Sequence, residues 1–159
     1  MLPVTILTVG RLKDRFFEDA SAEYMKYLKQ FAKTEIVEIP AATLPDNPVQ
    51  SQIQSALDKE AELLLKRIPD SAFVAALCIE GKQYSSEDMA ELLKTNQQTG
   101  KPVFFIIGGS YGLAETVKKR ANVRLSMSRM TFPHRLARIM LLEQIYRGFT
   151  INAGKTYHK

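Results

Sequence analysis

The sequence has one cysteine, two histidines and no tryptophan among its 159 residues. A single thiol supplies neither a disulfide framework nor a cysteine metal site. Cys78 lies within the apolar stretch FVAALCI, so we expect a buried structural thiol, which suits the reducing cytoplasm. His134 and His158 are 24 residues apart and the acidic residues are scattered, so the sequence predicts no metal site.

Long apolar runs are also missing. No segment approaches the ~20 apolar residues with which a helix crosses a bilayer, so we expect no membrane partner. Residues 1–10 are apolar, but Arg11 and Lys13 follow where a signal peptide would have small residues. We interpret this stretch as a first strand and expect a cytoplasmic protein.

Acidic residues become scarce toward the end of the chain. Residues 1–80 hold 9 Lys and Arg against 12 Asp and Glu, whereas residues 81–159 hold 13 against 5. From Thr116 onward there are 10 basic residues and one acid, Glu143. A basic surface is often no more than a solvated one, but this imbalance points to a polyanion such as nucleic acid.

What the sequence does have is a regular alternation of strand and helix patterns. Short apolar or alternating runs predict strands at 4–10, 34–40, 72–79, 103–107 and 123–128. Amphipathic spacing predicts helices at 16–31, 49–68, 85–100, 114–121 and 134–151. No repeat, low-complexity tract or linker interrupts the pattern. Residues 1–159 are therefore predicted to form one α/β domain with a mostly parallel sheet and helices on both faces.

The last predicted helix is apolar on nearly every side. A helix of this kind is buried against more than one surface. In a small domain the second surface is naturally another subunit, so the sequence predicts a homodimer. The apolar positions are Leu136, Ile139, Met140, Leu141, Leu142, Ile145, Tyr146 and Phe149.

The stretch VFFIIGGSYGL, residues 103–113, allows more than one kind of chemistry. Gly108, Ser110 and Gly112 fit G-x-S-x-G, the nucleophile elbow of serine hydrolases. A triad also needs an acid and then a histidine, and Glu115 is the only acid between Ser110 and His134. Glu115 follows the serine too closely to orient a distant imidazole, so this interpretation is disfavoured.

Two nucleotide-binding motifs are absent around the same turn. A P-loop needs Lys-Ser/Thr after the glycines, and a Rossmann fingerprint follows the first strand rather than a late one. A Gly-Gly-x-x-Gly turn at the carboxyl end of a strand remains, and open α/β sheets bind ligands there. The alternative is that Gly108, Gly109 and Gly112 only close a tight turn.

Several stretches together are more specific than any one of them. The segments ILTVGRLKDRFF, IIGGSYGL, LSMSRMTFPHRLARIMLLEQIYRGFTI and the terminal YHK closely resemble the RlmH family of SPOUT-class methyltransferases. The resemblance extends from end to end. It implies a SPOUT-type α/β domain with a C-terminal trefoil knot, and a homodimer with the knots at its interface.

The resemblance also implies an activity. Family members transfer a methyl group from S-adenosyl-L-methionine to N3 of a pseudouridine in helix 69 of 23S rRNA, on assembled ribosomes. The cofactor-binding positions implied here are Leu77, Gly108, Gly109, Gly112, Met127, Ser128, Arg129, Met130, Thr131 and Phe132. The catalytic positions implied are His134, Arg138, Arg147, Tyr157 and His158.

Simpler roles compete with the implied catalytic ones. Arg147 is spaced to pair with Glu143 on the same helix, and Tyr157 and His158 could be a frayed end. Within the family interpretation, His158 is the best candidate for a general base because imidazole titrates near neutral pH. A non-catalytic rRNA-binding protein that keeps the fold is the alternative function.

Overall fold

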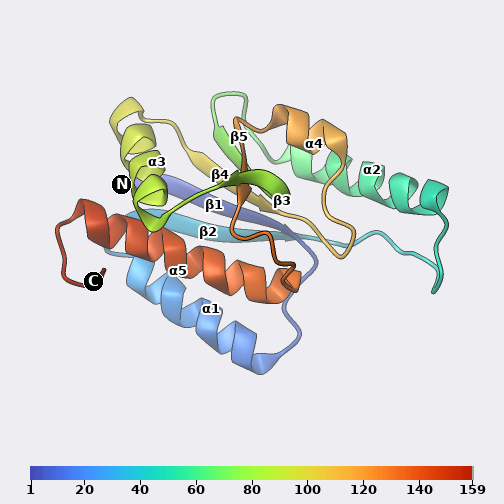
Figure 1. Cartoon of the computed structure of the whole chain (residues 1–159), viewed down its shortest axis with the longest axis horizontal. Coiled ribbons are helices and arrows are strands. Elements are labelled where there is room, and N and C mark those ends of the chain that lie inside the picture. The colour runs from blue at the N-terminus through green and yellow to red at the C-terminus, as the bar shows by residue number, and fades with distance from the viewer. Residues whose placement is uncertain (159) are drawn as a thin grey trace.

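The computed structural model describes residues 1–158 (Figure 1). Strands and helices alternate along the whole described chain. The elements are β1 (Leu2–Val9), α1 (Arg15–Leu28), β2 (Ala32–Ile39), α2 (Gln50–Lys66), β3 (Phe73–Gln83), α3 (Ser86–Thr99), β4 (Val103–Ile107), α4 (Glu115–Arg120), β5 (Val123–Ser126) and α5 (His134–Asn152). Every predicted element is present, with boundaries that mostly shift by one to three residues.

The strands form one parallel sheet in the order β2-β1-β4-β3-β5. Because all strands point the same way, their carboxyl ends and the loops that follow gather at one edge. The central strand β4 is buried along its whole length, and its side chains enter two separate cores. A strand covered on both faces has to be apolar throughout, which explains the uninterrupted run VFFII.

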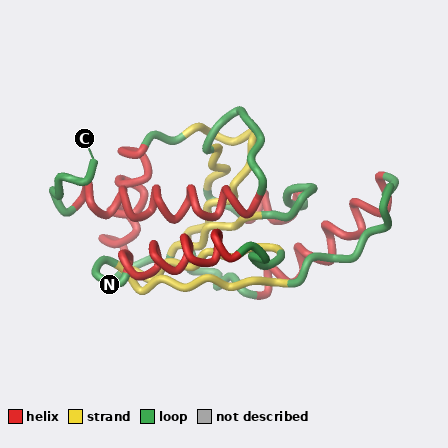
Figure 2. Tube along the Cα trace, turned by 90° about the horizontal axis from the view of Figure 1, so that it is seen from below, coloured by secondary structure: helices red, strands yellow, loops and turns green. Residues whose placement is uncertain are grey.

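Helices cover both faces of the sheet. On one face α1 and α5 lie side by side with α3 next to α5, and on the other lie α2 and α4 (Figures 1 and 2). The first core lies between the sheet and the layer of α1, α3 and α5. It contains Phe105 of β4 and Leu141 and Leu142 of α5, each fully buried. The second core lies between the sheet and the helices α2 and α4. It contains Leu7 and Ile106 of the sheet and Val117 of α4. The predicted α/β class is therefore confirmed; the knot stays a prediction.

The largest boundary error lies in β3, predicted to end at Ile79 but extending to Gln83. Pairing with β5 is interrupted after Leu77 and resumes at Lys82, across a shift in register. Gly81 lies in the interruption, where a Cβ atom would be 2.5 Å from the carbonyl oxygen of Arg124. Glycine is needed here because the two backbones pass so closely. The residues after Ile79 show no alternation of apolar and polar side chains, so the extension of β3 to Gln83 could not be predicted from the sequence.

The ends of α3 follow the predicted signals. The Ser85 hydroxyl accepts a hydrogen bond from the Asp88 amide at 3.0 Å, and the Asp88 carboxylate accepts one from the Ser85 amide at 2.9 Å. Gly100 ends the helix with φ of +69°, a conformation that favours glycine. The two hydrogen bonds between Ser85 and Asp88 form a reciprocal capping box, which satisfies two free backbone amides at the start of the helix.

Candidate functional site

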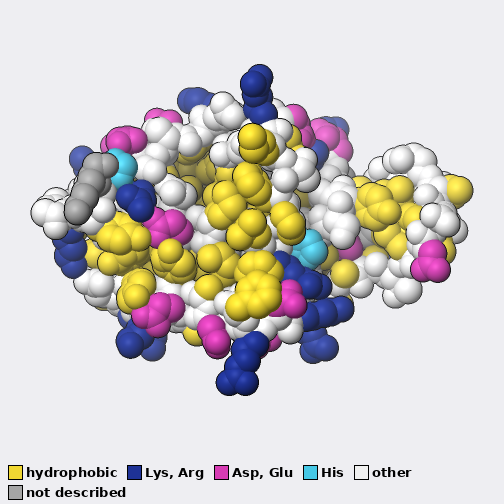
Figure 3. Space-filling view, turned by 60° about the horizontal axis from the view of Figure 1, so that its bottom comes forward, with side chains coloured by type: hydrophobic (Ala, Val, Ile, Leu, Met, Phe, Trp, Pro, Cys, Tyr) yellow, Lys and Arg dark blue, Asp and Glu magenta, His cyan; other side chains and the backbone are white. Residues whose placement is uncertain are grey.

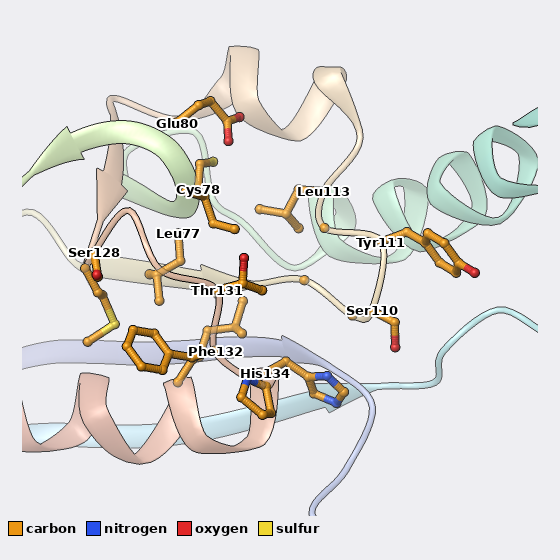
Figure 4. A pocket seen from close by; sticks show the side chains of 18 of the residues that line it. Leu77, Cys78, Glu80, Ser110, Tyr111, Leu113, Ser128, Thr131, Phe132 and His134 are labelled. Atoms are coloured by element: carbon orange, nitrogen blue, oxygen red, sulfur yellow. The ribbon is translucent and has the colours of Figure 1, made fainter.

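A cavity of about 910 Å³ opens beyond the carboxyl ends of β3, β4 and β5 (Figure 4). Its walls come from five parts of the chain: the end of β3, the turn after β4, helix α4, β5 with the loop after it, and the first turn of α5. Nine of the ten predicted cofactor-binding residues line it, and Arg129 is the exception. The lining residues are 77–80, 107–113, 118, 125, 127–128, 130–135 and 137.

The glycine turn after β4 closes on itself. Gly112 donates its amide to the carbonyl oxygen of Gly109 at 3.1 Å and has φ of +80°. A Cβ atom at Gly108 would overlap the backbone carbonyl of Gly112. The requirement for glycine at 108 thus arises inside the turn. The tight-turn interpretation is therefore confirmed, while ligand binding by this turn stays a prediction, which the position of the turn in the cavity wall supports.

The serine hydrolase interpretation finds no support in the geometry. Ser110 is exposed and makes no hydrogen bond to a histidine within residues 1–158. Glu115, the only acidic residue between Ser110 and His134 in the sequence, pairs with Arg124 at 2.9 Å. Without a base beside the hydroxyl and an acid behind that base, Ser110 is not activated as a nucleophile.

The loop after β5 is held by its own serines. The Ser126 hydroxyl donates to the Ser128 carbonyl oxygen at 3.0 Å, and the Ser128 hydroxyl accepts from the Met130 amide at 3.0 Å. The loop therefore has a fixed shape while it presents Thr131 and Phe132 to the cavity (Figure 4). Met130 is 72% exposed at the rim of the cavity.

Three further residues line the upper wall of the cavity, although the sequence did not predict them there. Lys118 bridges Glu80 at 2.6 Å, and this hydrogen bond lowers the pKa of Glu80 and raises that of Lys118. Cys78 is buried beside them, and burial raises the pKa of its thiol. The bulge of β3 between Leu77 and Lys82 brings Glu80 to the cavity wall. In the sequence, only its position directly after the predicted strand end at Ile79 could have indicated this.

The first turns of α5 form the lower wall. His134 lines the cavity, and burial, followed by the charges of Arg135 and Arg138, lowers the pKa of its imidazole. This shift favours the neutral form of the His134 imidazole. Arg138 lies behind the wall, and its side chain is 3% exposed. Its guanidinium donates to Glu38 at 2.8 Å and to the Gly10 carbonyl oxygen at 3.2 Å.

The remaining predicted catalytic residues gather at the other end of α5. Arg147 pairs with Glu143 at 2.8 Å, as its spacing predicted, and lies over the ring of Tyr157 at 4.7 Å. The Tyr157 hydroxyl donates to Glu143 at 2.8 Å, and burial raises its pKa. The Arg147 nitrogen Nη1 lies 3.3 Å from His158 Nδ1. The tail is therefore docked on α5 rather than frayed.

This tail cluster is remote from the cavity of the same chain. Thirteen residues separate His134 from Arg147 on one helix, or about 20 Å along its axis. His158 also has both ring nitrogens engaged. A guanidinium can only donate, so Nδ1 accepts from Arg147 and Nε2 faces Glu87 at 2.8 Å. In this arrangement neither nitrogen is free to accept a proton.

Other kinds of site find no support in the described residues. Within positions 1–158, no group of three or more His, Cys, Asp and Glu side chains is placed to hold a metal ion. Over the same stretch, no helix has the length and apolar character needed to cross a membrane.

Comparison with known proteins decides the family. The model of a family described as predicted SPOUT methyltransferase matches residues 2–158. The chain belongs to this methyltransferase family. Curated relatives named ribosomal RNA large subunit methyltransferase H align over nearly their whole length. The protein from Pelotomaculum thermopropionicum is 46% identical over 99% of both chains, and that from Streptococcus mutans is 44% identical over 99% of this chain and 100% of its own.

Solved structures agree on the fold at much lower identity. A probable methyltransferase from Bordetella pertussis aligns with a TM-score of 0.57 at 13% identity, covering 93% of this chain and 95% of its own. A methylase family protein from Neisseria gonorrhoeae aligns with a TM-score of 0.54 at 15% identity, covering 91% and 82%. At such identities the likeness shows a shared fold alone.

Proposed function

We propose that this enzyme methylates N3 of a pseudouridine in helix 69 of 23S rRNA, with S-adenosyl-L-methionine as donor. The observation that carries the proposal is the cavity at the carboxyl edge of the sheet, built from the segments that the RlmH resemblance singles out. Relatives named for methylation of large-subunit rRNA match the entire chain at 44–46% identity. We propose that the protein acts in the cytoplasm on assembled ribosomes, as the RlmH resemblance implies.

The cavity fits such a donor. Its volume of about 910 Å³ lies in the range of small-molecule sites, and it pairs apolar walls with fixed backbone groups. Leu77, Met127 and Phe132 would face the adenosyl group, while the turn of residues 108–113 supplies backbone amides and carbonyls. When bound, the donor supplies an electrophilic methyl group.

The chain's own contribution is positioning and charge. Loss of a proton from pseudouridine N3 leaves an anion, and fixed cations stabilise such a charge most strongly where water is excluded. Arg135 lies in the cavity wall, paired with Asp14, and Arg138 lies behind it, paired with Glu38. The N–H groups that these ion pairs leave over, such as Arg135 Nε, could stabilise an anion at this wall. Neutral His134 can accept a proton or a hydrogen bond there, which makes it a second candidate base beside His158.

A homodimer would complete the site. Hydrophobic side chains form a broad patch on the face that carries α1 and α5 (Figure 3). Leu136, Ile139 and Met140 on α5 are only half-buried in the single chain. The tail with Tyr157 and His158 lies about 20 Å from its own cavity, so we propose that it acts at the cavity of a second copy.

Two measurements test the proposal and separate it from a non-catalytic rRNA-binding role. Ribosomes that lack the methyl group are incubated with protein and donor, and the mass of helix 69 fragments is compared before and after. A gain of one methyl group on the pseudouridine-containing fragment is expected. Titration calorimetry with S-adenosyl-L-methionine should give heat of binding; a pure RNA-binding protein would give none and would leave the fragment mass unchanged.

A further inference from the structure

Residues 11–15, which form the end of the β1–α1 loop and the first residue of α1, carry three cations. Arg11, Lys13 and Arg15 are all exposed, whereas Leu12 between them is buried. None of the three takes part in an ion pair with another of residues 1–158. Positive charge in this loop is therefore free for an outside partner.

The same loop is fastened to the wall of the donor cavity. The buried Arg138 donates to the Gly10 carbonyl oxygen at 3.2 Å, and Arg135 bridges Asp14 at 3.3 Å. The Leu12 amide donates to Glu38, the ion-pair partner of Arg138, at 3.3 Å. Because Arg135 itself lines the cavity, these contacts fix the loop at the cavity rim. Lys and Arg side chains gather beside a histidine on this face (Figure 3).

The composition of the loop does not serve the stability of α1. Arg15 occupies the first position of the helix, where the macrodipole favours anions and disfavours cations. Phe16 follows and is 67% exposed, with its ring centroid 4.4 Å from that of Phe17. Unpaired cations next to an exposed aromatic ring break local rules of stability, and such exceptions are expected at functional surfaces.

We propose that residues 11–16 bind a single-stranded segment of rRNA beside the nucleotide that is methylated. Arg11, Lys13 and Arg15 contact consecutive phosphates, and the Phe16 ring stacks on an unpaired base. Single-stranded RNA is recognised by this combination of a basic track and aromatic platforms. The inference rests on the proposed function, because it identifies the surface that holds the rRNA of that reaction.

The phosphate contacts are tested with a triple variant, Arg11→Gln, Lys13→Gln and Arg15→Gln. A control with the same charge change, Lys33→Gln, Lys94→Gln and Lys101→Gln, alters exposed cations remote from the cavity rim. Binding to ribosomes that lack the methyl group is measured between 0.05 and 0.3 M salt, in the usual range for such titrations. Three phosphate contacts contribute about 2–3 to the slope of log K against log salt, so the triple variant should bind roughly 100-fold more weakly at 0.1 M.

The outcomes separate this inference from the proposed function. Donor affinity of the triple variant, measured by calorimetry, should equal that of the wild type because no donor-site residue changes. If both variants lose equal ribosome affinity, bulk charge rather than this loop attracts the RNA, and the inference is wrong. If the wild type methylates ribosomes and the triple variant binds them as tightly as the wild type does, the inference fails while the proposed function stands. A wild type without donor binding or methylation would overturn the proposed function itself.

The stacking contact needs its own variants. Phe16→Ala should weaken ribosome binding about 5- to 100-fold, the range for loss of one stacked base, while Phe16→Tyr should restore it. Sedimentation of the free Phe16→Ala protein separates RNA stacking from burial between subunits. A Phe16→Ala protein that loses its oligomeric state, or keeps full ribosome affinity, would rule out the stacking role.

Discussion

The ion pair of Glu38 with Arg138 leads to an asymmetric prediction. Arg138 is 3% exposed, whereas the Glu38 side chain is 38% exposed. Removal of the exposed partner, in Glu38→Gln, leaves a buried guanidinium without a counter-charge, which typically costs 3–5 kcal/mol. The partial exposure of this pair and the amide oxygen of the new glutamine reduce the expected cost to roughly 2–3 kcal/mol.

Removal of the buried partner should cost less. In Arg138→Met an apolar side chain of similar length occupies the buried site, and Glu38, 38% exposed, stays in contact with solvent and keeps its hydrogen bond from the Leu12 amide. The expected loss is about 1 kcal/mol or less, because replacement of buried charges by apolar groups is often nearly neutral. The double variant should resemble Arg138→Met alone, which gives a coupling energy of about 2 kcal/mol.

Urea denaturation followed by circular dichroism measures these differences at fixed protein concentration, since association alters apparent stability. With a slope of ~2 kcal/mol per molar urea, Glu38→Gln should lower the midpoint by about 1 M. A loss in Arg138→Met equal to or larger than that in Glu38→Gln would refute the reasoning from burial. Methylation by a folded Arg138→Met protein then tests the separate prediction that this charge acts in catalysis.

Further predictions concern the cavity and the tail. Ser110→Ala should methylate ribosomes within about twofold of the wild type, since its hydroxyl is not activated as a nucleophile; a complete loss of activity would reopen a role for the serine. Gly112 has φ of +80°, so Gly112→Ala should lower the free energy of unfolding by about 1 kcal/mol or more and weaken donor binding in calorimetry. In the control Gly109→Ala, the new Cβ would lie 3.4 Å from Val9, and stability and donor binding should change little. Because burial raises the pKa of Cys78, less thiolate is present at pH 8 than for a free thiol; alkylation should be slow there, faster at higher pH, and slowed again by donor. Equal rates with and without donor would contradict its place in the donor site. Truncation of residues 157–159 should abolish methylation and leave donor affinity unchanged; full activity would end the tail hypothesis.

Much of the fold could be predicted because local patterns and burial agree. The run VFFII had to be a strand covered on both faces, and the Ser85–Asp88 box and Gly100 marked the ends of α3. The extension of β3 through Gly81 could not be predicted, because it depends on the close approach of β5. Periodicity reports which side of an element is buried, and it carries no information on which distant strand lies beside it.

The candidate site divides in the same way. The glycine turn stood out, since strand ends in a parallel sheet meet at one edge, and the loop of residues 127–132 was implied by the family resemblance. Glu80 and Lys118 did not, because 38 residues separate them and only the fold brings them within 2.6 Å. The buried position of Arg138 was equally hidden, since its partner Glu38 is 100 residues away.

The docked tail and the proposed action at a second cavity are compatible on energetic grounds. Every polar contact of the tail is partly open to water: the His158 side chain is 31% exposed and that of its partner Glu87 is 64% exposed. Pairs of this kind contribute little net stability, and the Tyr157 hydrogen bond to Glu143 contributes only about 1 kcal/mol. A second copy that offers better contacts therefore shifts the tail without breaking the core of either chain. Release also frees His158 from Arg147 and Glu87, so the step that would carry the tail to the other cavity is the step that would make its imidazole available as a base.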